Sequence, residues 1–492
     1  MSRSTVSVLI HRTATEDVPV LDTKPWRDDV LRRCRAGARV LMLYGERRDD
    51  RAFITSVFLD GAGALGLTRT SATIQFGYHA LTPDLPAVHA LERELHEQTG
   101  VRIAAHPWLK PIRHEGREQA AMDAYPYYKI EGKEVHEVAV GPIHAGVIEP
   151  GSFRFMCLGE LVHHLEIQLG YQHRGVERRL LDGDPGRLAP LVETVAGDSS
   201  IAHTWAYCAA VERLADCEVE IETEVARAAA LELERCAMHL AGLSGMAADI
   251  GFLQGATTYG RLRTTAINTT MRLCGSRFGR GALRPGGVGI QLPASVLAEV
   301  KANLHLLRTD LAIINECFLT AETVKHRLRG VGTLSHAQAT ELGVVGLVAR
   351  ASGVALDVRQ HMAGAYELLP VAPRGFTGGD CWDRTRLRIA ELDVSLDWLE
   401  RILALCSDWQ KPRKPLGALA PKQLVVAVVE GWRGEVVHCL ETNEQGLLAH
   451  YKVQDPSLRN WMGLAIAVRQ NQISDFPICN KSFDLSYCGN DL

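Results

Sequence analysis

The chain has 492 residues, 46% of them hydrophobic and 23% charged, with a formal net charge of -4 at pH 7. These values are typical of folded globular chains and exclude disordered, collagen-like and coiled-coil proteins. The near-neutral charge gives no broad attraction to phosphate backbones, so we expect no nucleic-acid partner. No apolar run approaches the ~18 residues of a membrane-spanning helix, and the N-terminus has no signal-peptide pattern. We therefore expect a protein that is made and kept in the cytoplasm.

The twelve cysteines are scattered, and no two of them are three residues apart. Zinc ribbons, iron–sulfur sites and redox dithiols usually begin with a CxxC spacing, which is absent from this sequence. Several of the cysteines fall in apolar helical stretches, where a reduced cysteine acts as a small hydrophobic residue. The sequence therefore predicts no metal and no cofactor bound by this chain alone.

Two regions differ in their hydrophobic pattern. Up to about residue 115 the pattern is that of an α/β domain, with β-rich runs followed by an amphipathic helix at 86–98. A polar connector at 116–140 ends in a strand. From residue 141 onward helical patterns dominate, and strands return near the C-terminus. The long helical patterns cover 204–250, 257–274, 294–329, 335–352 and 390–407, and the strands cover 423–430, 435–441 and 447–453.

Three groups of polar residues stand at positions where an ordinary structural role is the simplest explanation. The first lies on a tight turn, where the alternative is an ordinary hairpin loop. The second lies at a strand-to-helix corner, where the alternative is helix capping. The third lies on one face of a helix, where the alternative is a surface ion pair worth a few tenths of a kcal/mol. These groups are His144 and Glu149, then His173, Arg174 and Glu177, then Glu232, Arg235 and His239.

Taken together, the motifs are highly specific. ERELHEQTG at 92–100, with HPWLK after it, resembles the 30-kDa-type peripheral subunit of complex I. GPIHAGVIEPGSFRF, LGYQHRGVE, LELERCAMHL, GSRFGRGALRPGGV and GWRGEVVHCLE resemble the 49-kDa subunit of complex I and, still more, large subunits of group 4 energy-converting [NiFe] hydrogenases of the formate hydrogenlyase type. Those hydrogenases carry both modules fused in this order, and the resemblance covers nearly the whole chain.

The resemblance implies an α+β fold in three parts. We expect a 30-kDa-like α/β domain at 1–115 and a linker with one strand at 116–140. A mainly helical domain with small β hairpins, of the hydrogenase large-subunit type, is expected at 141–492.

The positions that would hold a metal depart from the family pattern. A [NiFe] centre is bound by four thiolates from two CxxC pairs, because soft sulfur donors suit nickel and bridge it to iron. The four matching positions here are Ala196, Ser199, Ser486 and Gly489, with Cys488 one place out of register. The C-terminal tail that a maturation protease would remove is also absent from this sequence. We therefore expect no nickel–iron centre and no hydrogenase activity.

The quinone site of complex I is altered too. The resemblance places its headgroup histidine at Ser152 and its tyrosine near Gly197. A serine hydroxyl can donate a hydrogen bond but cannot deliver a proton as an imidazole does near neutral pH. The polar residues expected to remain in the cavity are Glu149, Asp198, His203 and Arg433. Glu149 matches a glutamate that resembles a proton-transfer group in group 4 hydrogenases.

The resemblance also implies partners on the cytoplasmic side of the inner membrane. These are a small subunit with a [4Fe–4S] cluster, a ferredoxin-like Fe–S subunit, a membrane heel subunit and antiporter-like membrane subunits. His173 and Arg174 are expected to face the cluster of the small subunit. The leading prediction is therefore a peripheral-arm subunit that couples redox or cavity events to ion movement.

Two alternatives remain open. One is a subunit of NADH dehydrogenase type that reduces a quinone or another small acceptor in the altered cavity. The other is a non-catalytic scaffold, in which the cavity is a relic. A relic cavity should fill with apolar side chains, because unpaired buried charge is costly. The retained Glu149, Asp198, His203 and Arg433 favour a functional cavity over a scaffold alone.

Overall fold

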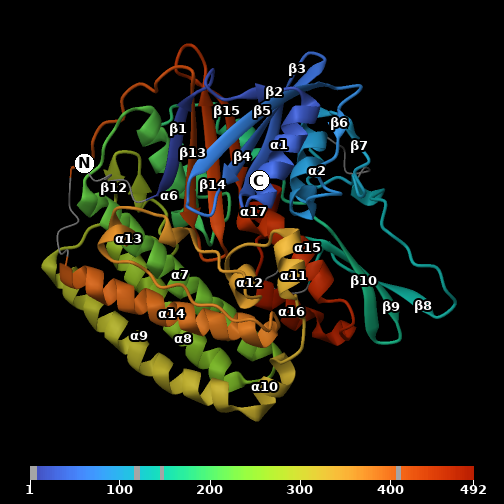
Figure 1. The fold of residues 1–492 in the computed structure, drawn as a ribbon. Coiled ribbons are helices and arrows are strands. Elements are labelled where there is room, and N and C mark those ends of the chain that lie inside the picture. The colour runs from blue at the N-terminus through green and yellow to red at the C-terminus, as the bar shows by residue number, and fades with distance from the viewer. Residues whose placement is uncertain (1–7, 116–121, 145–148, 406–411) are drawn as a thin grey trace.

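The computed structural model describes residues 8–115, 122–144, 149–405 and 412–492. Two four-stranded sheets lie side by side above a layer of long helices, and a three-stranded sheet projects from one side (Figure 1). The architecture is α+β, as the sequence predicts. Among the described residues, we find no helix that is both long enough and apolar enough to cross a membrane.

The first sheet belongs to the N-terminal region and has the strand order β2-β5-β4-β3. It consists of β2 (Val20–Leu21), β5 (Leu65–Thr73), β4 (Arg51–Leu59) and β3 (Arg39–Arg48). Helices α1 (Thr23–Arg35) and α2 (His89–Thr99) pack against it. The α2 helix ends at Gly100, whose φ of 74° is left-handed as expected of a C-cap glycine. Helix α1 was not expected from the sequence.

The second sheet has the order β1-β13-β14-β15 and is antiparallel throughout. It consists of β1 (Leu9–Ala14), β13 (Gln423–Glu430), β14 (Glu435–Thr442) and β15 (Leu448–Gln454). The first strand of the chain thus pairs with a strand more than 400 residues later, since Leu9 lies opposite Val428. The continuous apolar run of β13 is buried on both faces, and β1 completes its hydrogen bonding on the outer side.

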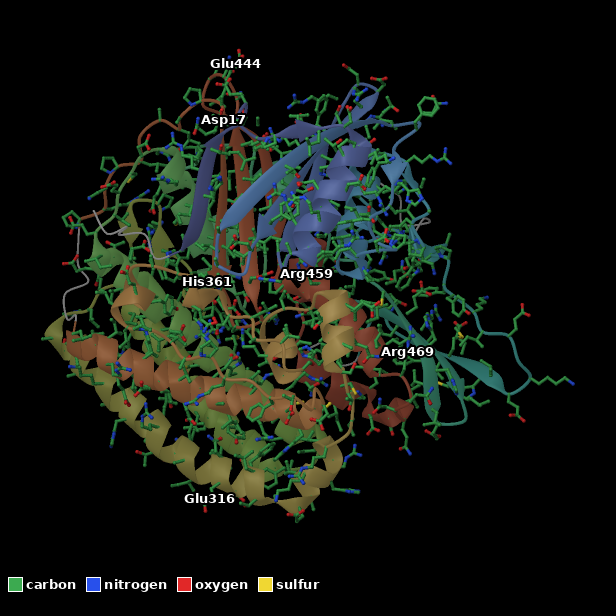
Figure 2. All side chains as sticks on the ribbon, viewed as in Figure 1. Asp17, Glu316, His361, Glu444, Arg459 and Arg469 are labelled. Carbon is green, nitrogen blue, oxygen red and sulfur yellow. The ribbon has the colours of Figure 1, made fainter. Side chains whose placement is uncertain are left out.

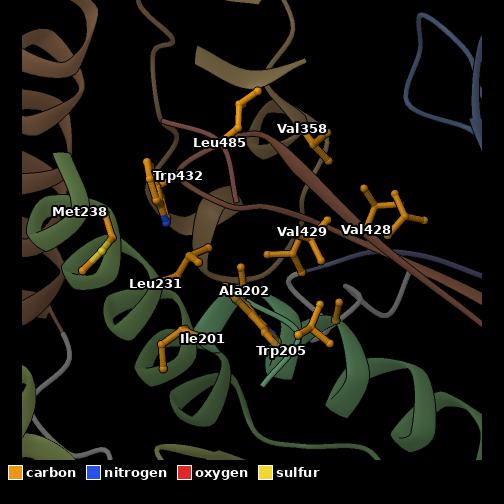
Figure 3. Packing of buried hydrophobic residues seen from close by; sticks show 14 of the residues in the cluster. Ile201, Ala202, Trp205, Leu231, Met238, Val358, Val428, Val429, Trp432 and Leu485 are labelled. Atoms are coloured by element: carbon orange, nitrogen blue, oxygen red, sulfur yellow. The ribbon is translucent and has the colours of Figure 1, made fainter. Parts of the chain in front are cut away.

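The core lies between this second sheet and the helices beneath it. Helix α6 (Ser200–Leu214) packs against β13 and β14, and nearly all of its side chains are buried. Figure 3 shows Ala202 and Trp205 of α6 next to Val428 and Val429 of β13. The side chain of Trp205 is fully buried. This packing fixes the N-terminal end of α6, which matters for the site described below.

A bundle of long helices forms the lower part of the molecule in Figure 1. The pattern expected as one helix over 204–250 is divided, because Asp216 adopts a positive φ of 50° between α6 and α7. The pattern expected over 335–352 is likewise divided at Gly343. The bundle and its attached helices are α7 (Ile221–Asp249), α8 (Leu253–Cys274), α9 (Ala294–Thr320), α10 (Glu322–Leu328), α11 (His336–Leu342), α12 (Gly346–Ala351) and α14 (Cys381–Leu405).

The three-stranded sheet on the side of the molecule has the order β10-β9-β8. It consists of β8 (Val135–Val140), β9 (Ser152–Leu158) and β10 (Leu161–Gln168). The C-terminal helices α15 (Pro456–Ala467), α16 (Phe476–Phe483) and α17 (Tyr487–Asp491) lie between this sheet and the helix bundle. The remaining short elements are β6 (Tyr78–His79), β7 (Ile103–Ala104), β11 (Leu283–Arg284), β12 (Gly287–Val288), α4 (Val176–Arg179), α5 (Ala189–Val192), α13 (Ala365–Leu368), η1 (Pro86–Val88), η2 (Val358–Gln360) and η3 (Ile473–Asp475).

Charged residues join the first sheet to the second sheet and to helix α15. Arg39 of β3 pairs with Glu435 of β14 at 2.8 Å. Arg459 lies near the centre of the molecule in Figure 2, and its guanidinium donates to the carbonyl oxygens of Val40 and Leu41. Burial lowers the pKa of Arg459 to about 10. The N-terminal region is therefore fixed to the second sheet by buried polar contacts as well as by strand β1. The predicted boundary at residue 115 stays a prediction.

Candidate functional site

A cavity of about 390 Å³ opens beside helix α7, where three other segments of the chain meet. The segment before α6 provides Asp198, and the turn between β13 and β14 provides Arg433. The segment from α16 to α17 provides Lys481 and Asp484, and Glu149 completes the rim. Three of the four cavity residues expected from the sequence therefore line one cavity, namely Glu149, Asp198 and Arg433.

Arg433 anchors the cavity wall. Its Nη1 and Nη2 each donate to a different carboxylate oxygen of Asp198, both at 2.7 Å. The Arg433 guanidinium also lies over the Trp432 ring at 3.8 Å, and Trp432 Nε1 donates to the carbonyl oxygen of Asp198 at 2.9 Å. Burial lowers the pKa of Arg433, but the Asp198 carboxylate outweighs it and holds the pKa above the ordinary value. Arg433 therefore stays charged and keeps Asp198 in place.

Glu149 binds main-chain groups, and no ion pair with an arginine is found for it among the described residues. Its Oε2 accepts from the N–H of Tyr487 at 3.0 Å and of Cys488 at 2.9 Å, at the start of α17. Arg433 lines the same cavity and pairs with Asp198. Glu149 thus contributes a carboxylate to the cavity and at the same time holds the C-terminal segment.

Asp484 and Lys481 add two charged groups that were not expected from the sequence. Burial raises the pKa of Asp484, although Arg388 and Arg433 oppose that shift. Lys481 pairs with Asp249 of α7 at 2.6 Å. Asp484 directly follows α16 and has a left-handed φ of 59°. The signal that could have revealed it is its place two residues before Ser486 in the altered ligand motif.

The four positions that match the metal ligands of the family, and that were expected to hold no metal here, have other structural roles. Ala196 is fully buried, and Ser199 Oγ accepts from Arg433 Nη1 at 3.3 Å. Ser486 Oγ accepts from the N–H of Gly489 at 2.9 Å and so caps α17. A Cβ at Gly489 would lie 2.6 Å from Cγ of Asp455, so a cysteine side chain does not fit there as the chain is arranged.

These residues do not fit a nickel–iron centre. Its soft metals need thiolate donors, and Cys488 is the one cysteine in the two matched motifs. Burial raises the pKa of Cys488 to about 11, which opposes the thiolate form that a metal requires. The donor set of the cavity is instead hard and charged, with carboxylates, hydroxyls, a lysine and an arginine.

His203, expected in the same cavity, lies apart from it. It faces β14 from α6, and its side chain is fully buried. Its Nε2 lies 3.1 Å from Asp455 Oδ2 and its Nδ1 lies 3.1 Å from Nε2 of His438. His438 in turn contacts the Tyr451 hydroxyl at 2.7 Å. The histidine is held by these contacts between α6, β14 and Asp455, and it does not line the cavity.

Ser152, at the altered quinone position, begins β9 and is buried. It lies opposite Gln168 of β10, whose Oε1 accepts from the hydroxyl groups of Tyr127 and Tyr171, the latter at 3.2 Å. Ser152 does not line the cavity that contains Arg433. The position thus belongs to a separate cluster of hydrogen-bonded side chains at the base of the projecting sheet.

His173 and Arg174 lie at the corner before α4, as expected. The Nδ1 atom of His173 lies 2.8 Å from the carbonyl oxygen of Asp491. Arg174 is exposed, and its guanidinium donates to the carbonyl oxygens of Thr194, Val195 and Cys488 at 2.7, 3.3 and 3.3 Å. Arg174 therefore connects the segment before α6 to helix α17. Its charge lies at the surface beside these two segments.

The helix motif of Glu232, Arg235 and His239 is fully buried, so it is not a surface ion pair. Arg235 donates to the carbonyl oxygens of Glu430 and Gly431, at 2.6 and 3.0 Å. His239 Nε2 contacts a carboxylate of α14 at 2.8 Å. The motif positions the turn between β13 and β14, and hence Arg433, from behind.

Comparison with known proteins gives a consistent result. Residues 249–415 match the family model described as respiratory-chain NADH dehydrogenase, 49 Kd subunit. The chain is 30% identical to membrane-bound hydrogenase subunit alpha of Pyrococcus furiosus, over 71% of this chain and 85% of that protein. It is 27% identical to formate hydrogenlyase subunit 5 of Escherichia coli, over 84% and 77%. It is 30% identical to an NADH-quinone oxidoreductase subunit of Carboxydothermus hydrogenoformans, over 65% and 86%.

Proposed function

We propose that this chain, which belongs to the family of complex I 49-kDa-type subunits and membrane-bound hydrogenase large subunits, is a peripheral-arm subunit of an ion-translocating complex. Relatives of the chain are named as subunits of multisubunit assemblies, which supports a role inside such a complex. In this role the chain binds no nickel–iron centre and couples a charge or redox change at the cavity to ion movement in a membrane arm.

The observation that carries this proposal is the chemistry of the cavity. The four family ligand positions hold no thiolate, yet the cavity keeps Glu149, Asp198, Arg433, Lys481 and Asp484. Maintaining this many charged groups in a partly buried site costs free energy unless each is paired or hydrogen-bonded. The network of charged side chains therefore supports a cavity that takes part in proton or charge transfer. It argues against a subunit that serves only as a structural scaffold.

The proposed partners follow the family. A small subunit with a [4Fe–4S] cluster would lie against the corner that carries His173 and Arg174. A ferredoxin-like Fe–S subunit would deliver electrons, and a membrane heel with antiporter-like subunits would lie beneath, with this chain on the cytoplasmic side. The exposed guanidinium of Arg174, beside the segments that form the cavity, is consistent with that placement. Quinone is an alternative small acceptor for the assembled complex.

Within the cavity we propose that Glu149 relays a proton or charge. The substitution Glu149→Gln tests this, because an amide oxygen can still accept from the N–H groups of Tyr487 and Cys488 but cannot titrate. We expect the variant complex to assemble normally and to lose ion transport coupled to electron transfer. The measurements are subunit composition of the purified complex and ion uptake into vesicles that contain it.

The matched control is Glu316→Gln, which removes an exposed carboxylate on α9, at the outer edge of the helix bundle in Figure 2. No residue of α9 lines the cavity. It should leave both assembly and coupled transport unchanged. Full transport by the Glu149→Gln complex would contradict the relay and favour a scaffold. Failure of that complex to assemble would show that Glu149 mainly holds the C-terminal segment, and would also refute the relay.

A further inference from the structure

Two cysteines that the proposed function does not use lie against each other between two helices. Cys381 is the first residue of α14, and Cys479 lies on α16. Both side chains are fully buried, and both sulfur atoms lie beside Gly332, since a Cβ built there would be 3.2 Å from Cys381 Sγ and 2.6 Å from Cys479 Sγ. Ser482 Oγ lies 3.4 Å from Cys381 Sγ. The fold thus brings two thiols close together, although no CxxC motif in the sequence predicts this.

A buried guanidinium without a carboxylate partner accompanies this dithiol. Arg384 is fully buried, and none of the ion pairs found among the described residues includes it. It donates to the carbonyl oxygens of Gly379 and Gly332, at 2.6 and 2.8 Å, and to Ser482 Oγ at 2.9 Å. A guanidinium keeps its charge in proteins, and a buried charge without an anion is costly. Some nearby group must supply negative charge.

The sulfur of Cys381 is the acidic group that contacts this guanidinium. Arg384 Nη2 donates to Cys381 Sγ at 3.4 Å. Burial raises the pKa of Cys381, but the hydrogen bond from Cys479 and the charge of Arg384 lower it to about 6. The same contact raises the pKa of Cys479 well above its ordinary value. The pair therefore consists of one thiolate and one thiol near neutral pH, whereas the pKa of the buried Cys439 is raised to about 12.

We propose that Cys381 and Cys479 form a redox-active pair that reacts with small hydroperoxides. The Cys381 thiolate attacks a peroxide oxygen, so that an S–O bond forms, the O–O bond breaks and the other oxygen leaves as alcohol or water after taking a proton. Cys479 then attacks the sulfenic sulfur of Cys381. An S–S bond forms, and the hydroxyl leaves as water with the Cys479 proton. Two thiols lose two electrons, and one hydroperoxide accepts them.

A thin layer of backbone covers the pair, which favours small oxidants. A Cβ at Gly332 would lie 2.6 Å from the sulfur of Cys479 and 3.2 Å from that of Cys381. Gly332 also has a left-handed φ of 62°, and its neighbours Gly330 and Thr333 are exposed. A glycine is therefore required where this loop crosses the sulfur atoms.

The disulfide would act on the cavity through α16. Asn480 and Lys481 directly follow Cys479 and line the cavity on the other side of that helix. A covalent bond to Cys381 would fix α16 to the start of α14. The oxidised chain should therefore hold the cavity wall more rigidly than the reduced chain. This inference does not depend on the proposed coupling function.

Peptide mapping of the protein in its complex tests the pair. The complex is treated with hydrogen peroxide, free thiols are alkylated and the digest is analysed by mass spectrometry. We expect a peptide that links Cys381 to Cys479 in most chains and that dithiothreitol removes. Cys381→Ser and Cys479→Ser should each abolish it. Cys157→Ser, a change at another buried cysteine, should leave it unchanged.

The rate of linkage should fall as the pH is lowered through about 6.

Absence of the linked peptide from wild-type protein, under conditions that oxidise the exposed Cys317, would overturn the proposal. A linkage rate that keeps rising up to about pH 9, the ordinary range of a thiol, would overturn the assignment of Cys381 as a thiolate. Both results come from the wild-type chain, so the test does not depend on the folding of the serine variants.

Discussion

Arg433 illustrates how much of the site depends on single side chains. One guanidinium pairs with Asp198, covers the Trp432 ring and binds the carbonyl oxygen of Asp484, so it connects all three segments that meet at the cavity. Its position in GWRGEVV made it a candidate from the sequence. The partner Asp198 was also a candidate from the sequence, but their pairing was not foreseen, because the two lie 235 residues apart.

At the same scale, Arg174 provides a test of the partner interface. A cation near an iron–sulfur cluster stabilises its reduced, more negative state. Replacing Arg174 with methionine should therefore lower the reduction potential of the small-subunit cluster, by on the order of tens of millivolts for a partly screened charge. The measurement is a redox titration of the purified complex followed by electron paramagnetic resonance.

Arg174→Lys is the matched control, since it keeps the positive charge and loses the guanidinium fork that binds the carbonyl oxygens of Thr194 and Cys488. The lysine variant should retain most of the original potential. If a fully assembled Arg174→Met complex shows the wild-type potential, Arg174 serves only to hold the chain segments together.

Helix α6 is important at the level of elements, because the segment directly before it provides Asp198 to the cavity. Glu234 of α7 accepts from the N–H of Ile201 at 2.7 Å and of Ala202 at 3.3 Å, within the first turn of α6. Burial raises the pKa of Glu234 to about 8, although those two hydrogen bonds oppose it. A carboxyl group with this pKa makes the stability of the fold depend on pH.

The pKa of Glu234 is higher in the folded chain than its ordinary value of 4.5, so the folded chain binds this proton more tightly than the unfolded chain does. The contribution to stability is full below pH 4.5 and is lost as the pH rises to about 8. Glu234→Gln should remove this dependence, on the order of 3–5 kcal/mol over that range. Urea unfolding at several pH values measures it, with Glu316→Gln as the exposed control. An unchanged pH profile in the Glu234→Gln variant would contradict a raised pKa.

Local sequence patterns predict individual strands, but they do not predict which strands pair across long distances in the chain. The strands near 423–430, 435–441 and 447–453 form as expected, since each is a compact β-rich run. Pairing of β1 with β13 could not be foreseen, because the alternation of a strand carries no information about its distant partner. The position of His203 was likewise missed, because the direction of a side chain on a fully buried helix depends on tertiary packing.

At the level of the whole molecule, the N-terminal strand β1 completes a sheet formed by strands from the C-terminal part of the chain. Buried polar contacts such as Arg39 with Glu435 join the same two regions. The family resemblance predicts two modules in this order, and that division stays a prediction. The sequence alone predicts the loss of the four cysteine ligands, because motif spacing identifies their positions. These positions are Ala196, Ser199, Ser486 and Gly489. Asp455 occupies the space beside Gly489 where a cysteine side chain would lie, and only the three-dimensional structure shows this.

We propose that this chain serves a complex of the hydrogenase and complex I family without holding a nickel–iron centre. Metal analysis of the complex, purified under anaerobic conditions and quantified per copy of this chain, tests this proposal. We predict iron, contributed by the clusters of partner subunits, and nickel at background, because the positions matched to the ligands offer no thiolate pair. Nickel in a one-to-one ratio with this chain would show that the chain does hold a nickel–iron centre.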